Sequence, residues 1–125
     1  MVGGSENLRQ QNPFDLVTLF DVVHDLADPI AALSDIRSSL GDGGTVLMME
    51  PRVERGLENN INDRAALLYG ISTFHCMTQS LAVGGAGLGA AWGPEAAEKL
   101  CRDVGFSSFE ELPIDNPFSA FYRVS

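Results

Sequence analysis

The chain has 125 residues and a formal net charge of −9, with only eight Lys and Arg residues, which are scattered along it. Dispersed cations exclude a basic surface for nucleic acid or an anionic membrane, and no apolar run approaches the length that crosses a bilayer. The first dozen residues lack a secretory leader pattern, so we expect a cytoplasmic protein with a polar segment, 1–12, and one domain, 13–125.

The first predicted elements are a strand and a helix. Residues 14–20, FDLVTLF, are apolar and β-branched, which predicts a strand buried on both faces. Asp28 and Pro29 suit the N-cap and first turn of a helix, which apolar residues at helical spacing extend to Leu40 before Gly41 ends it.

A second strand follows directly. GDGG at 41–44 predicts a turn, and the apolar run at 45–50 predicts a short strand that Pro51 terminates. A strand, a helix and a strand with short connections form a right-handed crossover, so the two strands should be parallel neighbours.

The rest of the chain predicts two more helices and a hairpin. Residues 62–80 and 94–104 have helical periodicity, and a glycine-rich loop at 82–93 separates them. The segments 106–114 and 118–125 alternate like two antiparallel strands joined through a turn. The predicted fold class is therefore α/β, with two parallel strands and a C-terminal antiparallel hairpin flanked by helices.

The two cysteines, Cys76 and Cys101, lie far apart and lack the paired spacing of a zinc site or a disulfide framework. We expect two reduced, mostly buried thiols. No metal site is predicted, although one built from His24, His75 and a carboxylate is an open alternative.

The glycine spacing at 84–89, GGAGLG, is similar to that of a nucleotide-binding loop. Such a loop must follow a strand and enter a helix at once, but only three apolar residues precede this one and the next helix starts near Pro94. A permuted nucleotide site with Glu110 as the ribose acid is the alternative to our preferred interpretation, a flexible cover over a cleft.

His24 and Asp25 follow the carboxyl end of the first strand, and Glu50 ends the second. Ligands of open α/β sheets bind outside these strand ends, so we expect the three residues to face one site. An imidazole oriented by Asp25 or Glu50 has the chemistry of a general base. The alternative is a loop histidine that caps the next helix or is solvated.

Four other residues are weaker candidates. His75 is expected to be a partly buried residue on a helix face. Phe74, Met77 and Trp92 either line an apolar ligand pocket or belong to the core.

Residues 14–51, from FDLVTLFDVVHDLADP to GGTVLMMEP, resemble the middle of a class I S-adenosylmethionine-dependent methyltransferase. The order of the later elements is similar to that family as well, so the resemblance spans Pro13 to Ser125. It implies a partial Rossmann-like methyltransferase sheet and methyl transfer from S-adenosylmethionine to a hydroxyl or amine of a small molecule.

The resemblance also implies roles for individual residues. In similar plant-type O-methyltransferases, the histidine of the matching His-Asp pair is the general base, a role that maps onto His24 with Asp25 beside it. We therefore expect His24, Asp25 and Glu50 to be catalytic, and Phe20 and Asp21 to contact the methionine side of the cofactor.

The family's glycine-rich cofactor loop and ribose-binding acid precede the segment that starts here at Phe14, and residues 1–12 are too few to form them. The strand at 15–20 should then be an exposed apolar edge. We expect a homodimer, or a second chain that supplies the missing half, to cover it.

Three functional hypotheses follow. The first is the C-terminal portion of a small-molecule methyltransferase. The second is a non-catalytic dimeric remnant or small-ligand-binding module of methyltransferase-like fold. The third is unrelated acid–base chemistry at His24 and Glu50.

Overall fold

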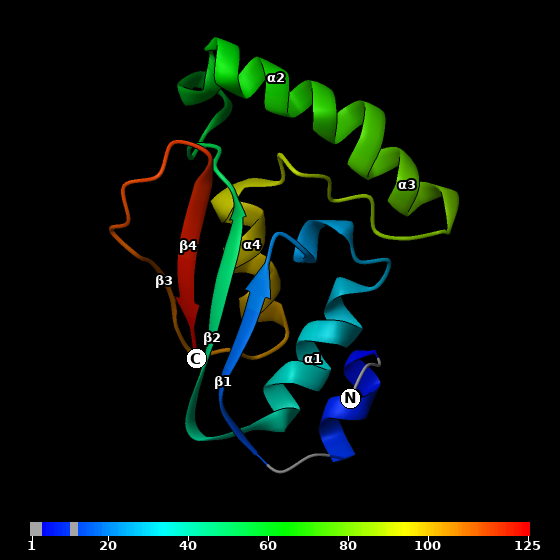
Figure 1. Ribbon diagram of the computed structural model, residues 1–125, viewed down its shortest axis with the longest axis vertical. Helices are drawn as coiled ribbons and strands as arrows, with labels where there is room; N and C mark the ends of the chain where they lie inside the picture. The colour runs from blue at the N-terminus through cyan, green and yellow to red at the C-terminus, as the bar shows by residue number, and fades with distance from the viewer. Residues whose placement is uncertain (1–3, 11–12) are drawn as a thin grey trace.

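The computed structural model describes residues 4–10 and 13–125 (Figure 1). The predicted polar segment at 1–12 therefore lies partly outside the described residues. Its described part contains a 3-10 helix, η1 (Ser5–Gln10), which packs on helix α1 (Pro29–Ser39). The Ser5 hydroxyl donates to Asp35 of that helix at 3.1 Å.

A four-stranded mixed sheet forms the centre of the fold. Its strands are β1 (Phe14–Phe20), β2 (Leu40–Pro51), β3 (Phe109–Glu111) and β4 (Ser119–Val124), in the order β1-β2-β4-β3. β1 and β2 are parallel, and the other two pairs are antiparallel. The predicted α/β fold, with two parallel strands and a C-terminal hairpin, is confirmed.

Helices cover one face of this sheet. α1 and α4 (Gly93–Asp103) supply core residues that pack with alternate residues of β2 and β4, namely Leu33, Ile36, Val46, Met48, Ala97, Cys101, Tyr122 and Val124. α2 (Asp63–Ile71) and α3 (Met77–Ala82) instead run across the end of the sheet where β1 and β2 terminate (Figure 1). In the described ranges, no helix is both long and apolar enough to cross a membrane.

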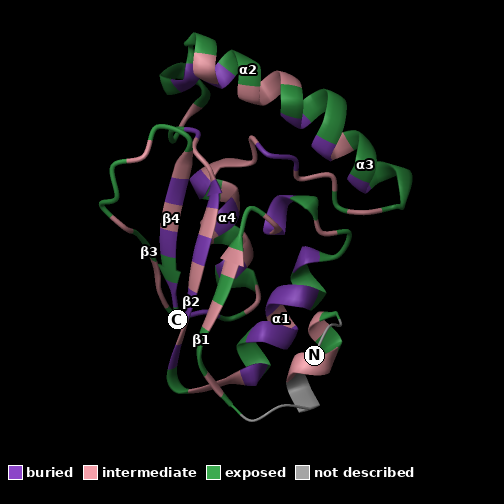
Figure 2. Cartoon of the chain, viewed as in Figure 1, coloured by how far each residue is buried: buried purple, intermediate pink, exposed green. Residues whose placement is uncertain are grey.

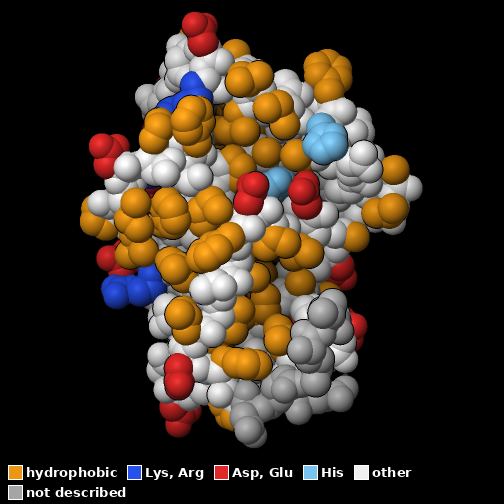
Figure 3. Space-filling view, in the orientation of Figure 1, with side chains coloured by type: hydrophobic (Ala, Val, Ile, Leu, Met, Phe, Trp, Pro, Cys, Tyr) orange, Lys and Arg blue, Asp and Glu red, His pale blue; other side chains and the backbone are white. Residues whose placement is uncertain are grey.

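The prediction that residues 14–20 are buried on both faces is wrong. β1 is an edge strand, and its side chains alternate between half-buried and exposed (Figure 2). Leu16 is 55% exposed and Phe20 is 52% exposed, because α1 and α4 pack against the opposite face. Figure 3 shows hydrophobic side chains gathered on this uncovered side.

The predicted turn at 41–44 lies within β2. The strand begins at Leu40, and its pairing with β1 shifts register between Phe14 and Leu16. Gly43 has φ 77°, in the left-handed region that favours glycine. A side chain at Gly44 would place its Cβ 2.7 Å from the Phe14 carbonyl oxygen, so glycine permits β1 to approach here.

α2 and α3 are joined by a π-helical turn, η4 (Ser72–Cys76), so the helix predicted at 62–80 is continuous but irregular. Its N-cap is Asn62, whose side chain accepts from the Ala65 amide. The buried positions carry small side chains, namely Ala65, Ser72, Cys76 and Ser80.

His75 and Phe74 point away from this buried face. His75 is exposed and Phe74 is 84% exposed, so the expected partial burial of His75 and a core position for Phe74 are wrong, whereas a role of Phe74 in an apolar pocket stays a prediction. Ser72 and Cys76 lie inward four residues apart, and the side chains of residues 73–75 between them are exposed.

α4 and the hairpin follow the predicted pattern closely. Gly105, at φ 96°, ends α4, and the amides of Gly105 and Phe106 donate to the backbone carbonyls of Arg102 and Cys101, respectively, in a Schellman arrangement. β3 is shorter than predicted at both ends; the Leu112 amide still donates to the Phe121 carbonyl, and Pro113, which lacks an amide proton, follows.

Candidate functional site

The parallel pairing of β1 and β2 brings their carboxyl ends to one edge. After Phe20 the chain turns through Asp21, which has a strained φ of 56° and donates its amide to the Met49 carbonyl at 2.8 Å. The short 3-10 helix η2 (Val23–Asp25) follows. His24 is thereby placed beside Glu50, the penultimate residue of β2.

Glu50 is only 2% exposed and is surrounded by donors. Its Oε1 accepts from the amides of Val22 at 3.3 Å and Val23 at 2.9 Å. Its Oε2 lies 2.6 Å from His24 Nδ1 and 3.2 Å from the indole Nε1 of Trp92. The backbone and indole N–H groups can only donate, so this buried side chain serves as an acceptor.

His24 is 4% exposed, and its two ring nitrogens have different surroundings. Nδ1 donates to Glu50, which leaves Nε2 as the basic nitrogen, 3.4 Å from Oδ1 of Asp25. Burial lowers the pKa of His24, but the hydrogen bond and charge of Glu50, helped by Asp25 and Asp21, outweigh burial and raise the pKa above 6.5.

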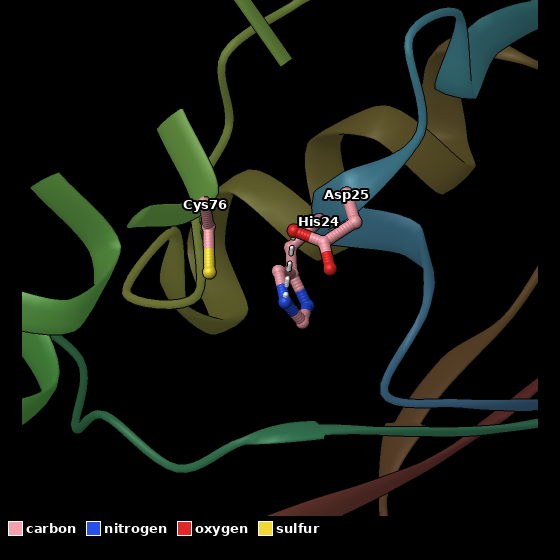
Figure 4. A group of neighbouring side chains, drawn as sticks. All are labelled: His24, Asp25 and Cys76. Atoms are coloured by element: carbon pink, nitrogen blue, oxygen red, sulfur yellow. Dashed lines mark ion pairs between the residues drawn. The ribbon is translucent and has the colours of Figure 1, made fainter. Parts of the chain in front are cut away.

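The structure also brings Cys76 to the His24 ring (Figure 4). One ligand atom each of His24, Asp25 and Cys76 lie within 4.8 Å of one another. The Cys76 side chain is buried, and burial raises the pKa of its thiol, as does the nearby Asp25 carboxylate. Cys76 was not predicted to lie at this site, although its four-residue spacing from Ser72 and Ser80 marks one helix face.

The glycine-rich loop at 84–89 supports the histidine segment. It lies between α3 and α4, so no strand precedes it as a nucleotide loop requires. The amides of Ala86 and Gly89 donate to the carbonyls of Ala27 and His24, at 3.0 and 3.3 Å. These two hydrogen bonds attach the loop to the histidine segment, and its role as a flexible cover stays a prediction.

The other candidates have different positions. Glu110, weighed as a ribose acid, pairs with Arg123 on the hairpin. Trp92 is half-buried and its indole N–H donates to Glu50, a polar contact that was not predicted from the sequence. Phe20 and Asp21 lie exposed at the end of β1, next to the His24 segment.

A surface cavity of about 610 Å³ lies between the ends of β2 and β3 and the loop that joins β3 to β4, outside the His24 cluster. Its Arg52 guanidinium already donates to Glu111 and to the Asn116 carbonyl. Because Arg52 is already paired within the protein, this cavity is a weaker candidate for a ligand site than the edge where β1 and β2 end.

The chain has a family match and structural neighbours among known proteins. A family model described as a methyltransferase domain matches residues 5–107. No curated protein matches the sequence.

Solved structures are similar over nearly the whole chain. A candidate O-methyltransferase from Nostoc punctiforme has a TM-score of 0.66 and 20% identity, covering 99% of this chain and 35% of its own. Human N-acetylserotonin methyltransferase in complex with SAM has a TM-score of 0.64 and 20% identity, with 99% and 32% covered. PigF with SAH has a TM-score of 0.62 and 17% identity, with 94% and 33% covered. The chain therefore spans about a third of the length of these structures.

Proposed function

We propose, from the premise that the chain belongs to the methyltransferase domain family, that it takes part in S-adenosylmethionine-dependent methyl transfer to a hydroxyl or amine of a small molecule. The observation that carries the proposal is the buried pair of His24 and Glu50 at the carboxyl ends of two parallel strands, with Nδ1 and Oε2 2.6 Å apart. Ligands of open α/β sheets bind at such strand ends.

His24 is the general base of the proposed reaction. Glu50 holds the Nδ1 proton, so the Nε2 lone pair is free to take the proton of an acceptor hydroxyl as the methyl group is transferred. The exposed Asp25 carboxylate beside Nε2 stabilises the imidazolium that forms. Glu50 acts through His24 and is a positioning residue.

Phe20 and Asp21 are the residues of this chain that we assign to the cofactor. They lie exposed at the end of β1, and two of the similar structures carry SAM or SAH. Of the glycine-rich segments in the described residues, 41–44 lies in a strand and 84–89 lies between helices. Neither joins a strand to a helix N-terminus, so we expect a weak contact with the cofactor's methionine end.

S-Adenosylhomocysteine should bind this chain with a millimolar dissociation constant, or about −4 kcal/mol. In amide NMR spectra, the shifts should centre on Phe20 and Asp21, and Asp21→Ala should weaken them. Asp115→Ala, which changes an exposed acid on the hairpin connection, is the matched control.

Shifts centred on the loop at 84–89 would instead assign the nucleotide to the glycine segment. An unchanged spectrum at millimolar ligand would favour the second hypothesis, a non-catalytic module that holds a small apolar ligand at the same strand edge. Unrelated acid–base chemistry at His24 and Glu50 predicts the same unchanged spectrum but requires both residues for turnover.

A second copy of the chain, or another polypeptide with the cofactor-binding part of the family's fold, is proposed to cover β1. This edge strand exposes Leu16 and Phe20 beside unpaired backbone groups, a surface that native proteins rarely leave open. α2 and α3 carry further exposed apolar side chains, namely Leu67, Ile71 and Leu81.

Sedimentation at micromolar concentration should therefore give a dimer. Thr18→Lys places a charge on the exposed face of β1 and should shift the protein toward monomer, whereas Ser38→Lys on the exposed side of α1 should not. A wild-type chain that sediments as a stable monomer would contradict self-association and leave a separate partner chain as the remaining form of the proposal.

A further inference from the structure

We infer that His24, Asp25 and Cys76 form a binding site for a soft divalent cation such as Zn²⁺, with one coordination position open to solvent. Among residues 4–10 and 13–125, these side chains are the group of three whose ligand atoms converge, all within 4.8 Å of one another. Imidazole, carboxylate and thiolate are the ligand types that proteins use for zinc.

The spacing of the nitrogen and oxygen ligands already fits such an ion. His24 Nε2 and Asp25 Oδ1 are 3.4 Å apart. Tetrahedral zinc with its usual bond lengths to nitrogen and oxygen separates the two ligand atoms by about 3.4 Å, and a sulfur ligand lies about 3.6 Å from each. A shift of the Cys76 sulfur by about 1 Å completes the set.

The surroundings of the cluster resemble those of known metal sites. Zinc-binding histidines usually donate their other N–H to a carboxylate, and the buried Glu50 accepts from His24 Nδ1 at 2.6 Å. His24 and Cys76 are buried, whereas the side chain of Asp25 is 55% exposed. A cation can therefore enter from the Asp25 side, where water or a ligand completes its coordination.

Binding forms bonds from the ion to Nε2, a carboxylate oxygen and the sulfur. The Cys76 thiol proton is released to solvent, and so is the Nε2 proton wherever the imidazole is protonated. The cation and the proton compete for Nε2, so bound Zn²⁺ prevents His24 from acting as a base. The inference does not depend on the proposed function, because it is tested by the spectrum of the bound metal.

Titration of the reduced chain with Co²⁺ tests the site directly. We expect one equivalent to bind with a near-ultraviolet thiolate charge-transfer band, which excess Zn²⁺ abolishes. Cys76→Ser should remove the band, and Asp25→Asn should weaken Co²⁺ binding at least about tenfold. Cys101→Ser and His75→Gln, which change the other cysteine and the other histidine, should keep the band and the affinity.

Three results would overturn the inference. They are a wild-type chain without a thiolate band at millimolar Co²⁺, a band that persists in Cys76→Ser, and an Asp25→Asn chain with unchanged affinity. Asp25 is exposed, so its replacement tests the site even where the buried Cys76→Ser change disturbs folding. Far-ultraviolet circular dichroism of each variant identifies loss of the fold.

Discussion

Glu50→Ala should lower the free energy of unfolding by about 3–5 kcal/mol, the usual cost of removing one partner of a buried charged pair. The change leaves the amides of Val22 and Val23, the His24 imidazole and the Trp92 indole without their acceptor in a buried site. Urea denaturation followed by circular dichroism measures the loss.

Two further variants separate the effect of burial from the effect of losing a negative charge. Glu110→Ala removes an exposed carboxylate that pairs with Arg123, so it should cost less than about 1 kcal/mol. Glu50→Gln keeps the size of the side chain but loses its charge. A Glu50→Ala chain as stable as Glu110→Ala would show that the buried contacts of Glu50 add little to folding.

The stability that the pair of His24 and Glu50 contributes depends on pH, and the pKa of His24 sets the direction of this dependence. The folded-state pKa of His24 lies above its ordinary value of 6.5. The stability that comes from the charged imidazole is therefore fully present below about pH 6.5 and is lost as the pH rises through the folded value. The difference in stability between wild type and Glu50→Gln should be larger near pH 6 than near pH 9.

The pairing of His24 with Glu50 was accessible from the sequence because a simple rule governs it. Parallel strands joined by one crossover end at the same edge of a sheet, so residues that follow those strand ends must approach each other. Local signals predicted the helices, because Asp28 caps α1 and Gly105 ends α4, and alternation of apolar residues predicted the C-terminal hairpin.

Cys76 and Trp92 were not accessible in this way. They reach the site from a helix and from the end of a loop, and their positions depend on the π-helical turn and on the packing of residues 84–89. Helical periodicity counted from Ala65 places Ser72 and Cys76 on one face, and the interpretation that put His75 partly inward is wrong.

The burial of β1 illustrates a second limit. An apolar, β-branched run shows what a strand can bury, but whether a neighbour covers it depends on the remaining elements. Here only one face is packed, and Leu16 and Phe20 are exposed. The expectation of an exposed apolar edge, which came from the family resemblance and not from the residues of the strand itself, is confirmed.

His24→Gln should reduce methyl transfer by about 10²–10⁴-fold, the usual contribution of a general base, while the S-adenosylhomocysteine-induced NMR shifts remain. The assay supplies millimolar radiolabelled S-adenosylmethionine and a panel of small phenols, with a chelator to keep the His24 cluster free of metal. His75→Gln, which changes the exposed histidine, is the matched control and should keep the wild-type rate.

The pH profile distinguishes a base from a structural histidine. A base must be neutral, so the rate should rise with pH through the pKa of His24, which lies above 6.5. Glu50→Gln removes the main group that raises this pKa, so the rising limb should move to lower pH as the maximal rate falls. A limb that stays in place in Glu50→Gln, or a His24→Gln chain as active as wild type, would remove His24 from the chemistry and leave methyl transfer to positioning of the acceptor alone.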